Sequence, residues 1–319
     1  ACFGQCAVLR GPVEQALPDA AAVLQRVCDA HYGRMFRMLW GADACSDVET
    51  GYAAVARSIA AFESSAEVSP YSSKYDAVLR GQAQLDPQEQ LGLELFHGKA
   101  HCSTCHTSAA SDGEAVVFSD FGFDNIGVPK NPRNPFYRMD KVENAGAPIN
   151  PAGSDWVDLG LGAFLEQLTV NEQWRAAPYV TPSMQALSSA QLTQLAADNL
   201  GKHRVPTLRN VDRRPAADFP KAYTHNGYFS TLRALVHFYN TRDVLPRCAG
   251  ELSQDEALAQ NCWPAPEVES GMETRLIGKL DLSDTEEAAL VSFLGALSDD
   301  TGAAGPMMMH GGMRAMRGR

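Results

Sequence analysis

Five consecutive residues, Cys102-Ser103-Thr104-Cys105-His106, carry the most distinctive chemistry in this sequence. They read C-x-x-C-H, which is the attachment pattern of a c-type haem. Two thiols at this spacing can add to the two vinyl groups of one haem, and the adjacent imidazole can supply an axial ligand to the iron. The pattern therefore predicts one covalent haem, held by Cys102 and Cys105 and ligated by His106.

Two other sites that use a C-x-x-C pair fit the surroundings less well. A structural zinc site needs a second Cys or His pair at similar spacing, and none follows in the sequence. A thioredoxin-like pair needs a strand–helix–strand context, whereas the flanks of this motif have a helical pattern. Haem attachment explains both cysteines and the histidine together.

The remaining six cysteines predict disulfides, because an even number in an oxidising compartment favours pairing. Local spacing suggests the pairs Cys28–Cys45 and Cys248–Cys262, with Cys2–Cys6 as a weaker third pair. Sequence alone does not fix the connectivity, and buried free thiols are the alternative.

The composition excludes some functions. The chain has 319 residues and a net charge of −11, so it lacks the basic surface that general nucleic-acid binding requires. An acidic surface suits a basic protein partner such as a small cytochrome, although many unbound proteins share it. No apolar run is long enough to span a membrane. No signal peptide is visible, and with a c-type haem we expect an exported, periplasmic protein whose signal peptide has been removed.

Helical periodicity predicts a mostly α fold that positions the motif. The expected helices cover 13–40, 47–64, 75–79, a segment from Asp86-Pro87 to Gly98, 160–175, 188–200, 230–239 and 283–298. Asp47 and Ser230 are the expected N-caps of two of them, and Ser283 with Glu286 forms a capping box for the last. Residues 107–160 are rich in Gly, Pro, Asn and Asp, and we expect them to form a long irregular loop around the haem rather than strands.

Several motifs, taken together, resemble one family from about residue 50 to 298. The chain resembles the bacterial di-haem cytochrome c peroxidase and MauG superfamily, specifically its C-terminal haem domain. The segments that carry the resemblance, in family order, are residues 55–63 (VARSIAAFE), 92–96 (GLELF) before C-x-x-C-H, 118–120 (FSD), 123–129 (FDNIGVP), 205–211 (VPTLRNV), 223–227 (YTHNG) and 280–283 (LDLS).

The resemblance implies further haem-binding residues. In this family the sixth iron ligand lies fourteen residues after the His of an x-His-x-Gly turn, which places it at Tyr239 when counted from His225. Electron-accepting peroxidases have Met at this position, whereas the MauG-like branch has Tyr. A tyrosinate stabilises ferric and higher iron states, while a thioether raises the reduction potential. Met184, His203 and His237 are other candidate ligands, His225 is expected to hydrogen-bond near the haem, and Arg209 is expected to pair with a haem propionate or to lie in solvent.

The sequence also departs from the family pattern. The family carries two haems, but this chain has a single C-x-x-C-H, so no residue is assigned to the peroxide-reacting site and the catalytic residues are unknown. MauG-like proteins use a Trp two residues before the first haem Cys as an electron relay, and here that position is Ala100. Another aromatic residue, Trp174 or Trp156, would have to serve. The family's Ca²⁺ ligands, which are backbone carbonyls, fall on Pro220 and Ala222.

The expected organisation has three parts. Residues 1–80 form the inter-domain segment with the remnant of an N-terminal peroxidatic haem domain, 81–300 the C-terminal cytochrome c-type domain, and 301–319 a flexible Met-rich tail. The segment between the haem motif and Tyr239 is longer than in the family, with the excess in about 135–200 and 213–220. Residues 307–316 contain thioethers and an imidazole that suit Cu(I), although a disordered terminus is the alternative.

These features together predict a periplasmic c-type haem oxidoreductase that uses hydrogen peroxide. In the MauG-like case, a haem ligated by His106 and Tyr239 stores oxidising equivalents and oxidises a substrate, with a protein as one candidate. The alternatives are a di-haem cytochrome c peroxidase, which reduces peroxide with electrons from a small cytochrome, and a mono-haem electron carrier.

Overall fold

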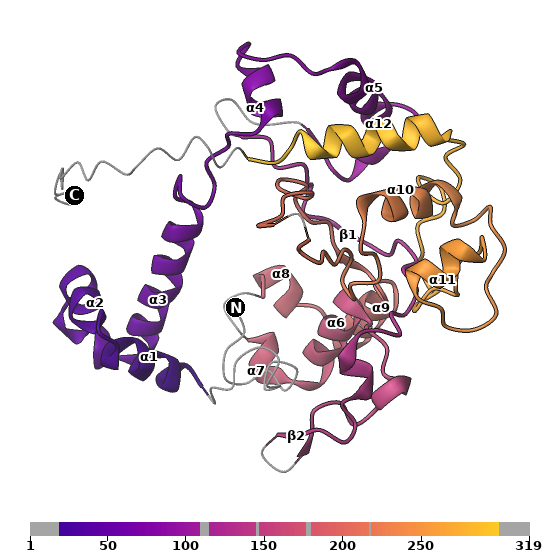
Figure 1. The fold of residues 1–319 in the computed structure, drawn as a ribbon. Helices are drawn as coiled ribbons and strands as arrows, with labels where there is room; N and C mark the ends of the chain where they lie inside the picture. Colours follow the sequence, from indigo (N-terminus) through magenta and orange to yellow (C-terminus); the bar gives the residue numbers. More distant parts are fainter. Residues whose placement is uncertain (1–18, 109–114, 145–146, 177–179, 217, 300–319) are drawn as a thin grey trace.

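The structure, a computed structural model, describes residues 19–108, 115–144, 147–176, 180–216 and 218–299. It is mostly helical, as predicted (Figure 1). The α-helices are α1 Ala20–Asp29, α2 Gly33–Trp40, α3 Val48–Glu63, α4 Lys74–Leu79, α5 Pro87–His97, α6 Gly160–Val170, α7 Glu172–Arg175, α8 Pro182–Gln185, α9 Ser189–Ala197, α10 Leu232–Thr241, α11 Gln254–Ala259 and α12 Asp284–Gly295. Among the described residues, no helix combines the length and the apolar character that crossing a bilayer requires.

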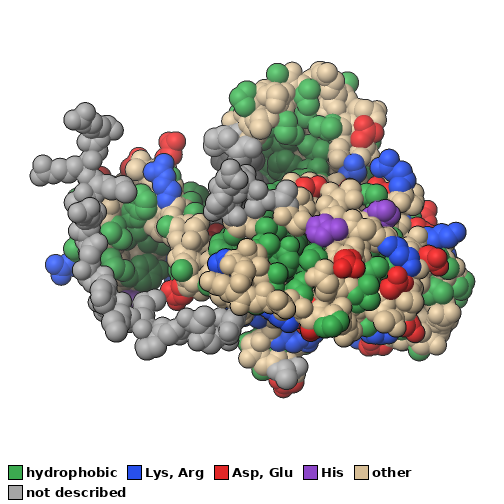
Figure 2. Space-filling model, turned by 90° about the horizontal axis from the view of Figure 1, so that it is seen from above, with side chains coloured by type: hydrophobic (Ala, Val, Ile, Leu, Met, Phe, Trp, Pro, Cys, Tyr) green, Lys and Arg blue, Asp and Glu red, His purple; other side chains and the backbone are tan. Residues whose placement is uncertain are grey.

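The first three helices form an arm that stands apart from the rest of the chain (Figure 1). The helical pattern of residues 13–40 is interrupted between α1 and α2, where the chain turns tightly. A side chain at Gly33 would place its Cβ 2.1 Å from the carbonyl oxygen of Cys28. The predicted Cys28–Cys45 disulfide is confirmed and closes the arm. Figure 2 shows hydrophobic side chains gathered on this arm, and Met38 is 75% exposed there.

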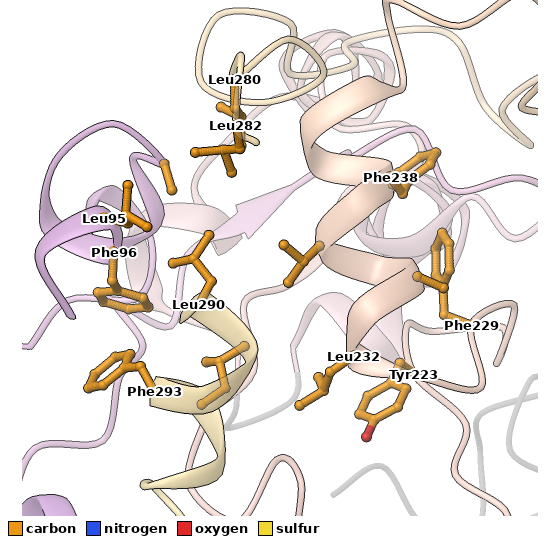
Figure 3. Packing of buried hydrophobic residues seen from close by; sticks show 14 of the residues in the cluster. Leu95, Phe96, Tyr223, Phe229, Leu232, Phe238, Leu280, Leu282, Leu290 and Phe293 are labelled. Carbon is orange, nitrogen blue, oxygen red and sulfur yellow. The ribbon is translucent and has the colours of Figure 1, made fainter. Parts of the chain in front are cut away.

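Helices α5 and α12 form the closest helix pair of the main body. Gly92 makes the contact possible, because a Cβ at this position would lie 2.1 Å from the carbonyl oxygen of Ala289. Helix α12 begins with the predicted capping box at Ser283, and α5 begins at the predicted Asp86-Pro87 with a capping box that the sequence analysis did not name. Figure 3 shows Phe96 and Phe293 side by side where the two helices meet, with ring centroids 5.3 Å apart.

Helix α10 carries Tyr239 and faces α12 across the core. The sequence analysis was wrong about its N-cap: Thr231, not Ser230, accepts the hydrogen bond from the Ala234 amide at 3.2 Å. Ser230 instead accepts a hydrogen bond from Gln254 of α11, a helix that the sequence analysis did not predict. The adjacent Ser and Thr are both good caps in isolation, so a tertiary contact decides between them.

The segment after the haem motif is irregular, as predicted. Its regular pieces are the 3₁₀ turns η4 Pro135–Arg138 and η5 Gly153–Asp155 and the two-residue strands β1 Phe123–Asp124, β2 Glu143–Asn144 and β3 Ala147–Pro148. Strand β1 pairs antiparallel with β4, His203–Arg204, and β2 pairs antiparallel with β3. The β1–β4 contact brings the segment after the motif beside His203.

Helices α6 to α9 build a second hydrophobic cluster, centred on Leu165, Leu168 and Leu192. It occupies much of the segment in which the sequence analysis expects this chain to exceed the family length, and that expectation stays a prediction. The second predicted disulfide, Cys248–Cys262, is confirmed and closes the loop around α11. The third, Cys2–Cys6, lies outside the described residues, as does the Met-rich tail.

The link between the arm and the main body is polar and buried. Ser72 donates its backbone N–H to Asp299 at 2.7 Å, and the buried Asp76 of α4 binds Arg209. Residues 72–76 are thus attached to the main body, while the domain boundary at residue 80 stays a prediction.

Candidate haem site

A cavity of about 520 Å³ lies between the haem motif, α10 and α12. Its walls are mainly aliphatic, and Figure 3 shows Leu290 of α12 and Leu232 of α10 on its two sides. Cys102, Cys105 and His106 line it, and so does Tyr239. The cavity falls within the size range of sites that bury a cofactor.

The motif forms a short 3₁₀ turn, η3 Cys102–Thr104, directly after α5. The His106 Nδ1 atom lies 2.9 Å from the backbone oxygen of Phe118. Since a carbonyl oxygen can only accept, Nδ1 carries the proton and Nε2 keeps its lone pair. Burial lowers the pKa of His106, which also favours the neutral ring. His106 is therefore prepared to bind a metal through Nε2.

The two motif cysteines are the ones that remain outside disulfides in the described part of the chain. Burial raises the pKa of the Cys102 thiol to about 12, and burial with the nearby Asp124 carboxylate raises that of Cys105 to about 12. These thiols are protonated at neutral pH and are not poised as nucleophiles or thiolate ligands. Their position suits thioether formation better than thiol-based catalysis.

Tyr239 lines the cavity from α10. Burial, together with nearby acidic groups, raises the pKa of its phenol well above the ordinary value. The phenol therefore keeps its proton unless a cation compensates for the buried negative charge, and a ferric iron would supply that compensation. Aliphatic walls, two thiols, an oriented imidazole and a phenol in one cavity fit the requirements of a haem c.

Arg209 does not line the cavity. Its guanidinium makes two hydrogen bonds of 2.7 Å to the carboxylate of Asp76, and its Nε donates to the backbone oxygen of Val116 at 2.6 Å. The guanidinium also lies 4.6 Å from the ring centre of Tyr71. These partners give Arg209 a structural role inside the protein, while the expected contact with a haem propionate stays a prediction.

His225 lies at the other edge of the cavity, against His203. The two imidazole rings are parallel, with centroids 3.6 Å apart. Burial, together with repulsion from His225, lowers the pKa of His203 to about 4, so His203 is neutral at pH 7. The Nε2 atom of His203 is buried without a hydrogen-bond partner among the described residues.

Asp158, His203 and His225 bring donor atoms within 4.8 Å of one another. The stacking does not suit a common metal ion. Imidazole lone pairs lie in the ring plane, and the planes of His203 and His225 differ by 5°. The two lone pairs therefore lie in separate, nearly parallel planes and do not converge on one point. The stacked pair therefore contributes an edge of the cavity and no metal centre of its own.

Glu267 anchors this edge, and the sequence analysis missed it. Its carboxylate accepts hydrogen bonds from the Tyr137 hydroxyl at 2.8 Å and from the Asp158 amide at 3.2 Å, and it lies 3.5 Å from His225 Nε2. Burial alone would raise the pKa of Glu267, but the bonds from His225, Tyr137 and Asp158 hold it below the ordinary value. No local sequence pattern links Glu267 with Tyr137, because 130 residues separate them.

The other candidate residues are spread over the molecule. Met184 packs in the second hydrophobic cluster, together with Trp174. His237 points its Nδ1 atom at Glu287, 2.9 Å away, and lines a smaller surface pocket. Trp156 packs against Tyr137 beside the cavity edge, with ring centroids 5.8 Å apart. Of the two residues assigned to Ca²⁺, Ala222 lines the cavity, and the calcium assignment stays a prediction.

The chain is similar to known haem proteins. It is 31% identical over 291 residues to the methylamine utilization protein MauG of Paracoccus denitrificans (strain Pd 1222), covering 90% of this chain and 62% of that protein. It is 26% identical over 210 residues to the cytochrome-c peroxidase IdrP1 of Denitromonas iodatirespirans, covering 66% of this chain and 45% of that protein. No protein-family model matches the chain.

A solved structure shares the fold. The diheme peroxidase BthA from Burkholderia thailandensis E264 superposes with a TM-score of 0.61 at 26% identity, covering 92% of this chain and 62% of that one. The chain thus spans less than two thirds of the length of these relatives. The motif, the cavity and these similarities agree: the chain belongs to the MauG and di-haem cytochrome c peroxidase superfamily.

Proposed function

We propose that this chain is part of a haem-dependent, peroxide-using oxidoreductase of the MauG-like type. Cys102 and Cys105 would hold a haem c covalently, and His106 and Tyr239 would be its axial ligands. When bound, the haem supplies the redox chemistry and stores oxidising equivalents derived from hydrogen peroxide. A redox protein or a protein substrate would provide the electrons.

The protein residues have defined tasks in this proposal. The Phe118 carbonyl fixes the tautomer and orientation of His106 through Nδ1. Leu232, Leu290 and their neighbours exclude water from the cavity, which strengthens electrostatic interactions inside it. Tyr239 would release its phenolic proton on binding ferric iron and so favour the oxidised state.

The observation that carries the proposal is the position of Tyr239 in the same cavity as the attachment motif. A Tyr at the family's ligand position is the feature of the MauG-like branch, whereas Met at this position is typical of electron-accepting peroxidases. The similarity to MauG, which covers 90% of this chain, supports the same choice.

We also propose that the protein works in the periplasm. Covalent haem attachment implies export, and the two disulfides of the described chain, Cys28–Cys45 and Cys248–Cys262, are typical of an oxidising compartment.

A di-haem cytochrome c peroxidase is the second candidate, and the similarity to cytochrome-c peroxidase IdrP1 favours it. Peroxide consumption distinguishes the MauG-like enzyme from the plain cytochrome c peroxidase. A plain peroxidase consumes peroxide only with a reduced small cytochrome, whereas a MauG-like protein becomes oxidised by peroxide without one and holds that oxidation. An intact mass of the native protein, which counts covalent haems, tests the third possibility: a mono-haem carrier has one haem and turns over no peroxide.

The test of the ligand assignment is Tyr239→Phe in the haem-loaded protein. Loss of a tyrosinate ligand should change the ferric absorption and EPR spectra and raise the reduction potential, because the ferric state loses an anionic donor. Tyr228→Phe is the matched control, since Tyr228 is equally an internal tyrosine but donates its hydroxyl to the Leu252 carbonyl. An unchanged ferric spectrum in Tyr239→Phe would show that another residue, such as His203, binds the iron.

A further inference from the structure

A line of aromatic and imidazole side chains joins the protein surface to the cavity. It begins at the half-buried Trp156, continues through Tyr137, and reaches the stacked rings of His225 and His203 by way of Glu267.

We propose that Tyr137 is a redox relay, with Glu267 as its proton acceptor, that carries electrons from the surface at Trp156 to the haem cavity. This inference rests on the proposed function, because hydrogen peroxide supplies the oxidising equivalent. It names Trp156 as the entry point for the electrons that the redox protein or protein substrate of the proposed function supplies.

The geometry of Tyr137 meets the requirement for reversible oxidation. A phenol that loses an electron becomes strongly acidic, so it needs a base already in place. The Tyr137 hydroxyl donates to Glu267 Oε1 at 2.8 Å, the Tyr137 residue is 6% exposed, and the Glu267 side chain is 3% exposed. The phenolic proton can therefore move along this one hydrogen bond to Glu267 when Tyr137 is oxidised, and return along it when Tyr137 is reduced.

The surroundings favour loss of the proton together with the electron. The Lys130 ammonium lies 4.6 Å from the centre of the Tyr137 ring, and a nearby cation disfavours a positively charged ring. The Glu267 carboxylate is ionised at neutral pH, because the bonds from His225 and the Asp158 amide add to that from Tyr137. A neutral tyrosyl radical with protonated Glu267 is the product that this environment stabilises.

The electrons and protons balance over the relay. Tyr137 would give one electron to a haem held in the cavity, with hydrogen peroxide as the source of the oxidising equivalent, and its proton would move to Glu267. Trp156 then gives one electron to the tyrosyl radical, and Glu267 returns the proton to the phenolate oxygen. The partner protein reduces Trp156, so the net event is the transfer of one electron from the partner to the haem.

The parallel His203 and His225 rings complete the path. Their centroid separation of 3.6 Å is van der Waals contact, and both rings line the cavity. His225 Nε2 lies 3.5 Å from Glu267 Oε2. Side-chain contacts therefore connect Tyr137 to the cavity edge without interruption.

The experiment injects oxidising equivalents from the surface without peroxide. A ruthenium tris(bipyridine) photosensitiser is attached to a cysteine introduced by S154C, at an exposed position beside Trp156, in the haem-loaded protein; peptide mapping confirms its location. A laser flash with an electron acceptor oxidises the label, which then takes an electron from ferrous haem through the same residues in the reverse direction. Absorption follows this oxidation of the haem. Freeze-quenched samples show radicals by EPR.

The expected result in the parent protein is haem oxidation with a solvent deuterium isotope effect and a tyrosyl EPR signal. Tyr137→Phe should abolish the signal and the isotope effect, because Phe has no proton to transfer and cannot be oxidised. Glu267→Gln should also abolish the isotope effect while keeping the phenol. Tyr228→Phe, whose hydroxyl faces a backbone carbonyl, is the matched control and should leave both signals intact.

The outcomes separate this proposal from the proposed function. If Tyr137→Phe keeps the parent rate, isotope effect and EPR signal, the relay is wrong even when peroxide oxidises the haem. If the flash generates the Tyr137 radical but peroxide added to the complete, unlabelled holoenzyme produces no haem oxidation, the relay stands and the peroxide-dependent function is wrong.

Discussion

The buried ion pair between Asp76 and Arg209 provides the sharpest test of how the main body is held together. The side chains are 6% and 8% exposed, and two hydrogen bonds of 2.7 Å join them. Asp76 also accepts from the Ser73 amide at 3.0 Å and so completes the capping box of α4, whose N-cap is Ser73. Asp76→Asn replaces one acceptor oxygen with an NH₂ group, which must then face either the guanidinium or the donors of Ser73.

The expected loss of stability is large. Breaking a buried ion pair by removing one partner typically costs about 3–5 kcal/mol. Arg209 keeps its bond to the Val116 carbonyl and its position over Tyr71, so we expect the lower end of this range, about 3 kcal/mol. Guanidinium chloride unfolding of the haem-loaded protein, with the disulfides intact, measures the change in the free energy of unfolding.

The pH dependence of the stability that Asp76 contributes has a definite sign. Burial by itself would raise the pKa of Asp76, but the bonds from Arg209 and Ser73 outweigh it and hold the pKa below its ordinary value. A carboxyl that ionises more readily in the folded state stabilises the protein above its unfolded pKa, so this contribution is complete above about pH 5 and is lost as the pH falls below about 4. Asp76→Asn should remove that part of the acid sensitivity.

Asp86→Asn is the matched control. Asp86 caps α5 but its side chain is 53% exposed, and Asn is as good a cap, so the free energy of unfolding should stay close to that of the parent protein. If Asp76→Asn costs no more than this control and instead shifts the haem spectrum, Arg209 serves the haem, and the structural role assigned to it is refuted.

Two further changes probe the packing and the loops. Gly92→Ala should destabilise the protein by about 2 kcal/mol, because the added methyl group overlaps the Ala289 carbonyl and forces α5 and α12 apart. Thermal unfolding measures this loss of stability, and an unchanged Tm would contradict the close helix contact. Replacing Cys248 and Cys262 together by Ser should lower the free energy of unfolding by about 3 kcal/mol, as expected for a loop of this length. Chemical denaturation of both proteins under oxidising conditions, where the parent keeps Cys28–Cys45 and Cys248–Cys262, measures this loss, and an unchanged free energy of unfolding in the variant would contradict it.

Local sequence predicted much of the fold because the relevant interactions are local. Asp86, Pro87 and Glu89 start α5, and Ser283 with Glu286 starts α12, by hydrogen bonds within one helical turn. The two confirmed disulfides close loops with sequence separations of 17 and 14, short enough for proximity along the chain to indicate the partners. Ser230 marks the limit of this reasoning, since a contact with α11 decided which neighbouring residue caps α10.

What the sequence determined by itself is the chemistry of haem attachment, because C-x-x-C-H brings two sulfurs and one imidazole together within five residues. Only the tertiary structure decided which distant residues become partners inside the protein. It joined Arg209 to Asp76, 133 residues away, and Tyr137 to Glu267, 130 residues away. Such pairs leave no periodic or local pattern, because burial selects them: a charge or phenol inside the protein must find a hydrogen-bond partner, wherever along the chain that partner lies.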